Sequence, residues 1–312
     1  MSIFCSTVIA TVGRPTLSRA VNSVLNQAFM ANEFEIIVVN DSGQPLPEAD
    51  WQRSGQVQVI NTHQRERSVA RNTGAAIAKG RYLHFLDDDD WLAPDAWQNI
   101  WALAKANNAI WLYGASQLVN RQAKPLIPLR HGLHGNCFIQ VMTGEWIPLQ
   151  ASLIETRAFF AAGGFNPRLA GPEDIDLLRR IALHGDIAGT ENLVAYIVRG
   201  EAGSTTDYTR HPEMSRWARE IILNSPGVFA RMRTSACSSD WHGRIVRIYL
   251  TSMVWNLQHK RLFLALSRAM FSLAGLILAT PYLFSSDFWR AVAKPYASET
   301  FARGFQQAQL ST

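Results

Sequence analysis

Residues 82–91 read YLHFLDDDDW, and this stretch decides the fold. Its first half, residues 82–86, is an apolar run with the length of one buried strand. Four consecutive aspartates follow at once, and carboxylates held together on a strand end are electrostatically costly unless a cation or solvent screens them. All-oxygen ligands select hard divalent ions, so the stretch predicts a site for Mg²⁺ or Mn²⁺. A solvated acidic loop is the alternative.

Strand and helix patterns alternate on both sides of this stretch. The predicted strands are residues 5–12, 35–40, 57–60, 82–86, 110–119, 145–148 and 193–198. The predicted helices are residues 17–25, 68–79, 94–107 and 173–184, with Gly80 expected to end the second of them. Alternation at this spacing predicts an α/β fold with a parallel sheet and helices on both faces.

Polar residues follow three of these strands directly. Thr11, Asp41 and the acids from Asp87 onward all stand at carboxyl ends. Ligands of open α/β sheets bind beyond the carboxyl ends of the strands. The sequence therefore predicts that three separate segments contribute to one site.

Composition and charge divide the chain into two regions. Residues 1–209 hold 17 Lys+Arg against 20 Asp+Glu, whereas residues 210–312 hold 13 against 5. We predict a catalytic domain at residues 1–208 and a basic, apolar helical region at residues 209–312. The three cysteines are isolated in the sequence, which argues against a disulfide framework or zinc site and favours a cytoplasmic setting. The first residues lack the basic region that opens a signal peptide.

The basic region contains a long apolar segment at residues 262–284, interrupted by Arg268 and Pro281. An arginine near its middle argues against a simple membrane span. Basic residues precede the segment, so it fits a helix lying at the inner face of a membrane as a peripheral contact. A helical appendage packed on the first domain, or in a homo-oligomer interface, is the alternative.

Several segments together resemble glycosyltransferase family 2. The resemblance covers roughly residues 3–205 and departs from the family pattern at Ala10, where proline is typical, and at Ser42-Gly43, whose order is reversed. Its motifs are VIATVGR (8–14), EIIVVNDSG (35–43), ARNTG (70–74), AKGRY (78–82) and FLDDDDW (85–91).

This resemblance implies a GT-A fold, which is a Rossmann-like, mostly parallel sheet flanked by helices, here with a C-terminal helical extension. It also implies a nucleotide-diphosphate sugar donor, UDP-linked, and inversion at the anomeric carbon. The acceptor would be a glycan or lipid-linked hydroxyl in polysaccharide synthesis at the cell surface. Asp89 would be the principal metal ligand, and Asp87 the second choice. The residues expected to contact the donor are Thr11, Arg14, Asp41, Arg67, Arg71 and Asp88.

An inverting transferase also needs a base that accepts the proton of the acceptor hydroxyl. Residues 171–177, GPEDIDL, resemble the acidic pair of the family at the start of a helix, and this nominates Asp174. A helix N-terminus stabilises the carboxylate form that a base requires. The alternative is that Glu173 and Asp174 only cap the helix.

Two other functions remain open at this stage. A nucleotidyltransferase shares strand-end acids and a divalent ion, although Gly13-Arg14-Pro15 is poorer in glycine than its phosphate loop. A non-catalytic nucleotide-sugar-binding module would be expected to lose Asp89 or Asp174, and both are present. No nucleic-acid partner is expected.

Overall fold

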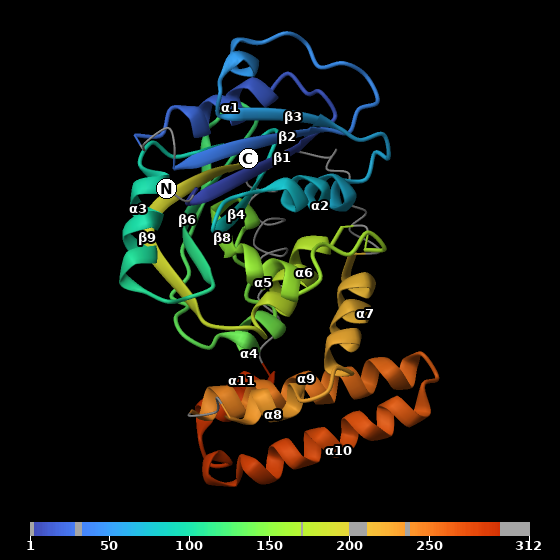
Figure 1. Cartoon of the computed structure of the whole chain (residues 1–312). Coiled ribbons are helices and arrows are strands. Elements are labelled where there is room, and N and C mark those ends of the chain that lie inside the picture. Colours follow the sequence, from blue (N-terminus) through green and yellow to red (C-terminus); the bar gives the residue numbers. More distant parts are fainter. Residues whose placement is uncertain (1–2, 29–32, 170, 200–210, 235–237, 294–312) are drawn as a thin grey trace. The chain divides into compact units, whose positions relative to one another are not determined.

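The computed structural model describes the chain except for residues 1–2, 29–32, 170, 200–210, 235–237 and 294–312 (Figure 1). Two compact units are present. The first comprises Met1–Asn136 with Ile147–His211, and the second Cys137–Trp146 with Pro212–Thr312. The predicted boundary between residues 208 and 209 lies outside the described residues, so it stays a prediction.

The first unit is built on a nine-stranded sheet with helices around it (Figure 1). Its strands are β1 (Cys5–Thr11), β2 (Phe34–Asn40), β3 (Val57–Asn61), β4 (Tyr82–Asp87), β5 (Trp91–Leu92), β6 (Trp111–Val119), β7 (Pro125–Leu129), β8 (Ser152–Glu155) and β9 (Ile187–Val198). Its α-helices are α1 (Leu17–Leu25), α2 (Arg67–Ile77), α3 (Ala96–Ala106), α5 (Thr156–Ala161) and α6 (Glu173–Ile181).

The sheet has the order β3-β2-β1-β4-β8-β6-β9-β5, with β7 paired to β6. Strands β1 to β4 pair in parallel, as do β6 and β9. Strand β8 is antiparallel to both of its neighbours, and β5 and β7 are also antiparallel to their partners. The sheet is thus mostly parallel, as predicted.

The central strands are largely apolar and buried, as expected of a sheet covered by helices on both faces. Ile36, Ile37, Val38 and Val39 of β2 are all fully buried. Strand β4 is likewise buried from Tyr82 to Leu86. The acids that follow are therefore mounted on a rigid element.

Helix α2 lies close against β1 and β2 because its inner face carries small residues. A Cβ atom at Gly74 would lie 2.4 Å from a methyl carbon of Val8 and 3.0 Å from one of Val39. The side chain of Glu66 caps the helix by accepting the backbone N–H groups of Ser68 and Val69 at 3.0 and 2.7 Å. The start of α2 is thereby fixed beside the ends of the strands.

The second unit is helical among its described residues. Its helices are α4 (Phe138–Met142), α7 (His211–Leu223), α8 (Val228–Thr234), α9 (Ser239–Gln258), α10 (Leu262–Leu278) and α11 (Ser286–Ala293). Helix α9 is central, and α11 approaches it closely at Gly243, where a Cβ atom would lie 2.5 Å from the carbonyl oxygen of Phe288. The Arg244 guanidinium donates to the Thr143 hydroxyl at 2.9 Å, which ties α4 to α9. No helix in the described part of the chain is both long and apolar enough to cross a membrane.

Two local predictions were wrong. Residues 145–148 do not form a strand; a 3₁₀ turn, η2 (Leu149–Ala151), precedes β8 at Ser152. Pro148 has no N–H group to contribute to a ladder. Helix α2 ends at Ile77 with Ala78 as its C-cap, so Gly80 is not the helix stop.

Gly80 is required for a different reason, its contact with β1. A Cβ atom there would lie 2.5 Å from the backbone nitrogen of Ser6 and 2.7 Å from the carbonyl carbon of Cys5. The Gly80 N–H also donates to the Ser6 hydroxyl at 2.8 Å. The backbone atoms that a side chain would meet cannot rotate away.

We expect Gly80→Ala to destabilise the first unit by about 1–3 kcal/mol, because strand β1 would have to shift. Gly55→Ala is the matched control, since nothing lies within 4 Å of a Cβ atom at Gly55. Urea denaturation followed by tryptophan fluorescence measures both variants. Equal midpoints for the two variants would contradict this reading of Gly80.

Candidate active site

The carboxyl ends of β1, β2 and β4 meet at one edge of the sheet. The Thr11 hydroxyl donates to Asp88 Oδ2 at 2.6 Å, and the Asp41 N–H donates to the Thr11 carbonyl at 2.8 Å. The structure thus brings together the three segments that the sequence placed at strand ends.

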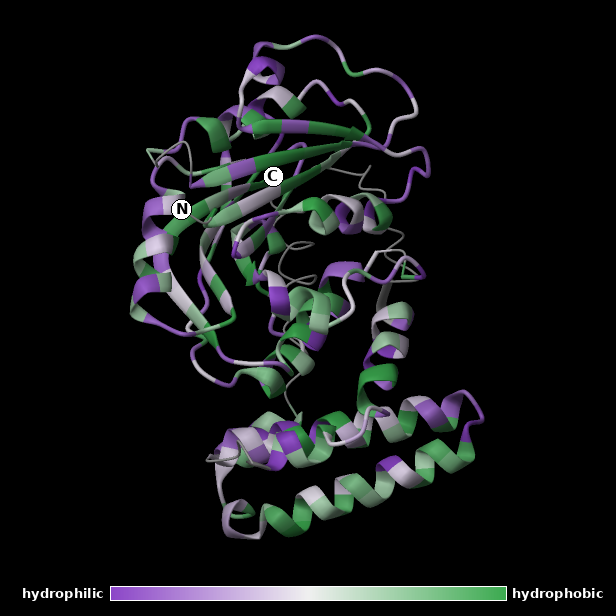
Figure 2. Cartoon of the chain, in the orientation of Figure 1, coloured by the Kyte–Doolittle hydropathy of each residue, from purple (hydrophilic) through white to green (hydrophobic). Residues whose placement is uncertain are grey.

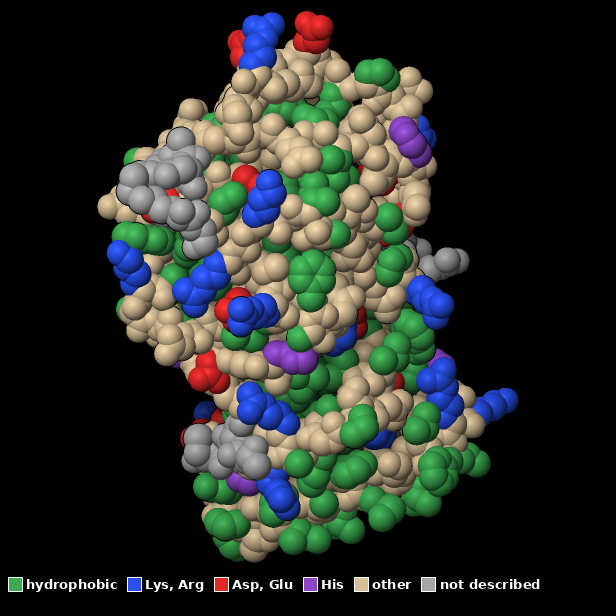
Figure 3. Space-filling view, viewed as in Figure 1, with side chains coloured by type: hydrophobic (Ala, Val, Ile, Leu, Met, Phe, Trp, Pro, Cys, Tyr) green, Lys and Arg blue, Asp and Glu red, His purple; other side chains and the backbone are tan. Residues whose placement is uncertain are grey.

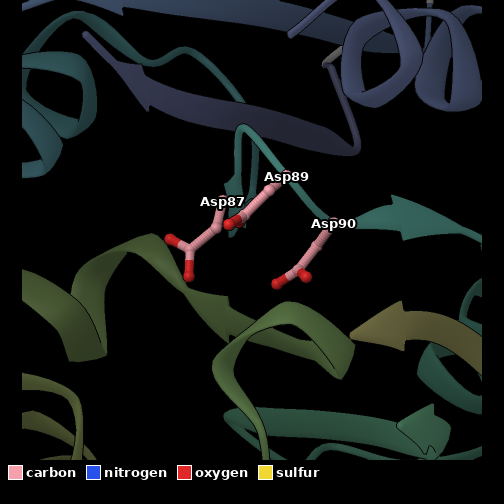
Figure 4. A group of neighbouring side chains, drawn as sticks. All are labelled: Asp87, Asp89 and Asp90. Carbon is pink, nitrogen blue, oxygen red and sulfur yellow. The ribbon is translucent and has the colours of Figure 1, made fainter. Parts of the chain in front are cut away.

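A tight turn separates the four aspartates into two sets. The Asp90 N–H donates to the Asp87 carbonyl at 3.1 Å, which closes the turn and returns the fourth acid toward the first. One carboxylate oxygen from each of Asp87, Asp89 and Asp90 lies within 4.8 Å of the others (Figure 4). Asp88 accepts hydrogen bonds from the Thr11 hydroxyl and from Arg14 instead. The turn therefore provides one cluster of three oxygen donors.

Asp90 is a member of this cluster that the sequence did not single out. A run of identical acids carries no signal that distinguishes its members, because only the turn decides which of them converge. Asp90 is 1% exposed, and its Oδ1 accepts the Val198 N–H of β9 at 2.7 Å. Strand β9 is thereby anchored to the turn.

The pKa values of the three clustered carboxylates are shifted in different directions. Burial raises the pKa of Asp90 well above its ordinary value, and the charges of Asp87 and Asp89 raise it further. Burial also raises the pKa of Asp89, again with repulsion from Asp87. At Asp87, burial is outweighed by the guanidinium of Arg71, which lowers the pKa of the carboxyl. The cluster thus holds more negative charge than its surroundings neutralise.

Arg71 connects the turn to helix α6. Its Nη2 lies 2.5 Å from Asp87 Oδ1, and its Nη1 lies 3.2 Å from Glu173 Oε1. The side chain is 7% exposed and Glu173 is 3% exposed, so the bridge is buried. Arg67 adds a second contact to Glu173 at 3.3 Å from a more exposed position. Residues about 100 positions apart are thereby held together.

Asp174 lies beside this bridge, in the first turn of α6. It is half-buried, and its Oδ1 accepts the N–H of Ile175 at 2.7 Å. Burial raises the pKa of the neighbouring Glu173, and the negative charge of Asp174 adds to that shift. Glu173 is engaged with Arg71 and Arg67, whereas Asp174 is the partly accessible acid of the pair.

Asp41 organises the loop that leads into α2. Its Oδ1 accepts the Thr62 hydroxyl at 2.8 Å and the Gln64 N–H at 2.9 Å. Its Oδ2 accepts the Glu66 N–H at 2.6 Å. Asp41 is 3% exposed, and its three hydrogen bonds fix residues 62–66 from the buried side of the loop.

Arg14 approaches the acids from the loop after β1. Its Nη1 lies 2.9 Å from Asp88 Oδ1 and 3.1 Å from Asp89 Oδ2. The arginine side chain is 45% exposed. It is therefore the solvent-facing cation of the turn, in contrast to the buried Arg71.

Gln150 is a further residue of the site that sequence reasoning missed. Its amide donates to Asp87 Oδ2 at 2.8 Å, and its carbonyl oxygen lies 2.9 Å from Nε2 of His84. Burial lowers the pKa of His84 to about 4, so the ring is neutral with its proton on Nε2. No motif surrounds Gln150, which reaches the site only because β8 pairs with β4.

Comparisons with known proteins agree with this architecture. Residues 6–148 match the family model described as Glycosyl transferase family 2. The poly(ribitol-phosphate) beta-N-acetylglucosaminyltransferase TarP of Staphylococcus aureus is 31% identical over 103 residues, which are 31% of this chain and 32% of TarP. The Escherichia coli glucosyltransferase WfgD is 30% identical over 112 residues, 35% of this chain and 43% of WfgD.

The chain spans only part of the length of the curated relatives that it matches. The first four of them are covered over 32%, 31%, 35% and 27% of their own length, about a third. Among solved structures, S. aureus TarS 1–349 in complex with UDP-GlcNAc superposes with a TM-score of 0.61 at 14% identity, covering 97% of this chain and 92% of that one. This likeness concerns the fold. The chain carries a glycosyltransferase family 2 domain with the GT-A fold.

Proposed function

We propose that the chain transfers a sugar from a nucleotide-diphosphate sugar to a hydroxyl group of a glycan or lipid-linked acceptor, with inversion at the anomeric carbon. The observation that carries this proposal is the bridge from the acid turn through Arg71 to α6. It holds a cluster of oxygen donors and a partly accessible acid, Asp174, on one side of the sheet edge. A single in-line displacement needs both a means to neutralise the leaving group and a base for the attacking hydroxyl.

The donor is proposed to be UDP-linked. WfgD is named as a UDP-Glc transferase, and TarS was solved with UDP-GlcNAc. Thr11 and Asp41 are the proposed nucleobase contacts, and Asp88 the proposed contact to the ribose or the donor sugar. Asp41 Oδ2 and both oxygens of Asp88 accept one hydrogen bond each and can accept a second, so the structural bonds of these residues are compatible with such contacts.

Arg14 and Arg67 are the better placed cations for the diphosphate. Their side chains are 45% and 42% exposed, whereas that of Arg71 is 7% exposed and pairs with two carboxylates. We therefore assign Arg71 to holding the site together, and Arg67 to contact with the donor.

The acid cluster fits a divalent cation. Asp89 and Asp87 are the proposed ligands, and Asp90 stands in the same cluster. Three carboxylate oxygens in a partly buried place match the preference of Mg²⁺ and Mn²⁺. Burial, and then repulsion from neighbouring acids, raises the pKa values of Asp89 and Asp90, and a bound cation would oppose both effects. When bound, the cation would supply Lewis-acid stabilisation of the charge on the leaving nucleotide diphosphate.

Asp174 is the proposed general base. Its place in the first turn of α6 favours the carboxylate form through the helix dipole. The ion pairs of the neighbouring Glu173 leave Asp174 as the acid that can accept a proton from an acceptor hydroxyl. The location at the inner face of a membrane, and a homo-oligomeric state, also stay predictions.

Asp89→Asn should lower the rate of nucleotide diphosphate release by about 10²- to 10³-fold, because one charged ligand of the cation is lost. The assay incubates a panel of nucleotide-sugars and an acceptor glycan with Mn²⁺ or Mg²⁺, and EDTA should abolish the signal. The exposed Asp95, whose side chain makes no capping bond at α3, provides the control Asp95→Asn. Pyrophosphate as the product would identify a nucleotidyltransferase instead.

Asp174→Asn should lower kcat by about 10²- to 10⁴-fold while the donor KM and the Mn²⁺ requirement stay unchanged, since the variant removes only the proton acceptor. Steady-state kinetics with varied donor and metal separate these parameters. Undiminished kcat would show that Asp174 only caps α6. Donor binding without turnover in the wild-type chain would favour a non-catalytic binding module.

Arg67→Met and Arg71→Met should separate donor binding from stability. We expect Arg67→Met to raise the donor KM with an unchanged unfolding midpoint. Arg71→Met should cost about 1–3 kcal/mol of stability, because the buried Glu173 keeps only its ion pair to the more exposed Arg67, and Asp87 keeps only the hydrogen bond from Gln150. Urea denaturation of both variants tests this. A midpoint unchanged in Arg71→Met would contradict the bridging role.

A further inference from the structure

The outer face of helix α10 is wholly apolar. All seven residues of α10 that are exposed carry large apolar side chains, and Phe263 is 84% and Met270 65% exposed. Figure 2 shows that α10 consists mainly of hydrophobic residues, and Figure 3 shows hydrophobic side chains gathered along it. The seven are Leu262, Phe263, Leu266, Met270, Leu273, Ile277 and Leu278.

The opposite face of the same helix is small and polar, and it is the buried one. Ala265, Ser272 and Gly275 face inward. Arg268, the charged residue of α10, is 2% exposed and lies 3.2 Å from Glu220 Oε2, and it donates to Asn224 Oδ1 at 2.6 Å. The arginine that interrupts the apolar segment in the sequence is therefore turned away from the apolar face.

Large apolar side chains are also exposed after the C-terminal end of α10, and two cations precede its N-terminal end. Phe284 is fully exposed and Trp289 is 51% exposed after α10. Lys260 and Arg261, both exposed, precede Leu262 directly. Lys260 has φ +58°, a backbone conformation that favours glycine, so this cation occupies a position where a side chain is disfavoured.

The chemistry of this face selects its partner. Protein interfaces carry about one hydrogen bond per 100–200 Å², yet no exposed side chain of α10 offers a conventional donor or acceptor. Hydrocarbon makes no such demand. Lys260 and Arg261 are exposed at the N-terminal end of this face, and their positive charge complements anionic lipid headgroups.

We propose that α10 lies flat in the interface of an anionic lipid bilayer. Its apolar face enters the acyl-chain boundary, and Lys260 and Arg261 contact headgroup phosphates. Seventeen residues give a helix about 25 Å long, whose exposed side chains are all apolar, as expected of an in-plane helix. Such a contact would hold the transferase domain where lipid-linked acceptors are found.

Flotation of the full chain with vesicles tests the proposal. Vesicles of phosphatidylcholine alone and of phosphatidylcholine with phosphatidylglycerol are compared, with no donor present, so the result is independent of catalysis. We expect the wild-type chain to float with the anionic vesicles. Leu266→Gln/Met270→Gln/Leu273→Gln should lower the partition coefficient at least about tenfold, because three inserted side chains are lost.

Two matched variants accompany this test. Leu126→Gln/Phe160→Gln replaces exposed apolar residues of the first unit and should float like wild type. Lys260→Gly/Arg261→Ser should weaken binding to the anionic vesicles alone, and high salt should have the same effect on the wild type. Glycine suits the positive φ at residue 260, so a loss of binding would not reflect unfolding.

The proposal fails if the wild-type chain does not float with anionic vesicles, or if the triple α10 variant floats as well as wild type. It also fails if the wild-type chain does not float and light scattering shows that it is an oligomer whereas the triple variant is a monomer. That result would assign the face to contact between copies. None of these outcomes bears on the transfer assay with a soluble acceptor, in which nucleotide diphosphate release is measured. The membrane proposal and the proposed transferase activity are therefore tested separately.

Discussion

Four aspartates follow a strand that is buried on both sides, and their charge has to be compensated largely without water. Each acid recruits its partners from a different part of the chain. Asp87 is held by Arg71 and Gln150, Asp88 by Thr11 and Arg14, and Asp90 by the Val198 N–H. The contacts that compensate the charge of this one turn thus hold together the end of β1, the N-terminal part of α2, η2 and the end of β9. Because Arg71 also reaches Glu173, the same constraint fixes the start of α6.

This arrangement leaves charge where the proposed chemistry would use it. Arg71 compensates Asp87, but the pKa values of Asp89 and Asp90 remain raised by burial and by repulsion from neighbouring acids. A divalent cation would complete the compensation, and the structural arginine would stay in place throughout. Meanwhile the pairing of Glu173 distinguishes the two acids at the start of α6, so that structural and proposed catalytic roles fall on adjacent residues.

In the second unit, several charged and polar residues are buried and many large apolar residues of α10 are exposed, the reverse of the usual arrangement. A buried network joins Glu220 to Arg268, Ser252 and Asn256, while large apolar side chains of α10 face outward. A water-soluble helix normally buries its apolar stripe. Here close packing with α9 uses small residues such as Gly275, which leaves the apolar stripe for another environment, the lipid surface that we propose.

Residue patterns in the sequence were enough to predict six of the nine strands, four of the five α-helices of the first unit and the place of the acid turn. Local periodicity and residue type decide these features, as at Ile36–Val39 and residues 82–90. The sequence also located Thr11, Asp41 and Glu173 at element ends. It could not separate Asp90 from its neighbours, find Gln150, or tell that Arg268 turns inward. Those outcomes rest on contacts between residues far apart in the chain, whose geometry exists only once β8 and β9 have joined the sheet and α7 has packed against α10. Only the tertiary structure decided them, because a pairing distance is a property of the folded chain and leaves no local pattern in its sequence.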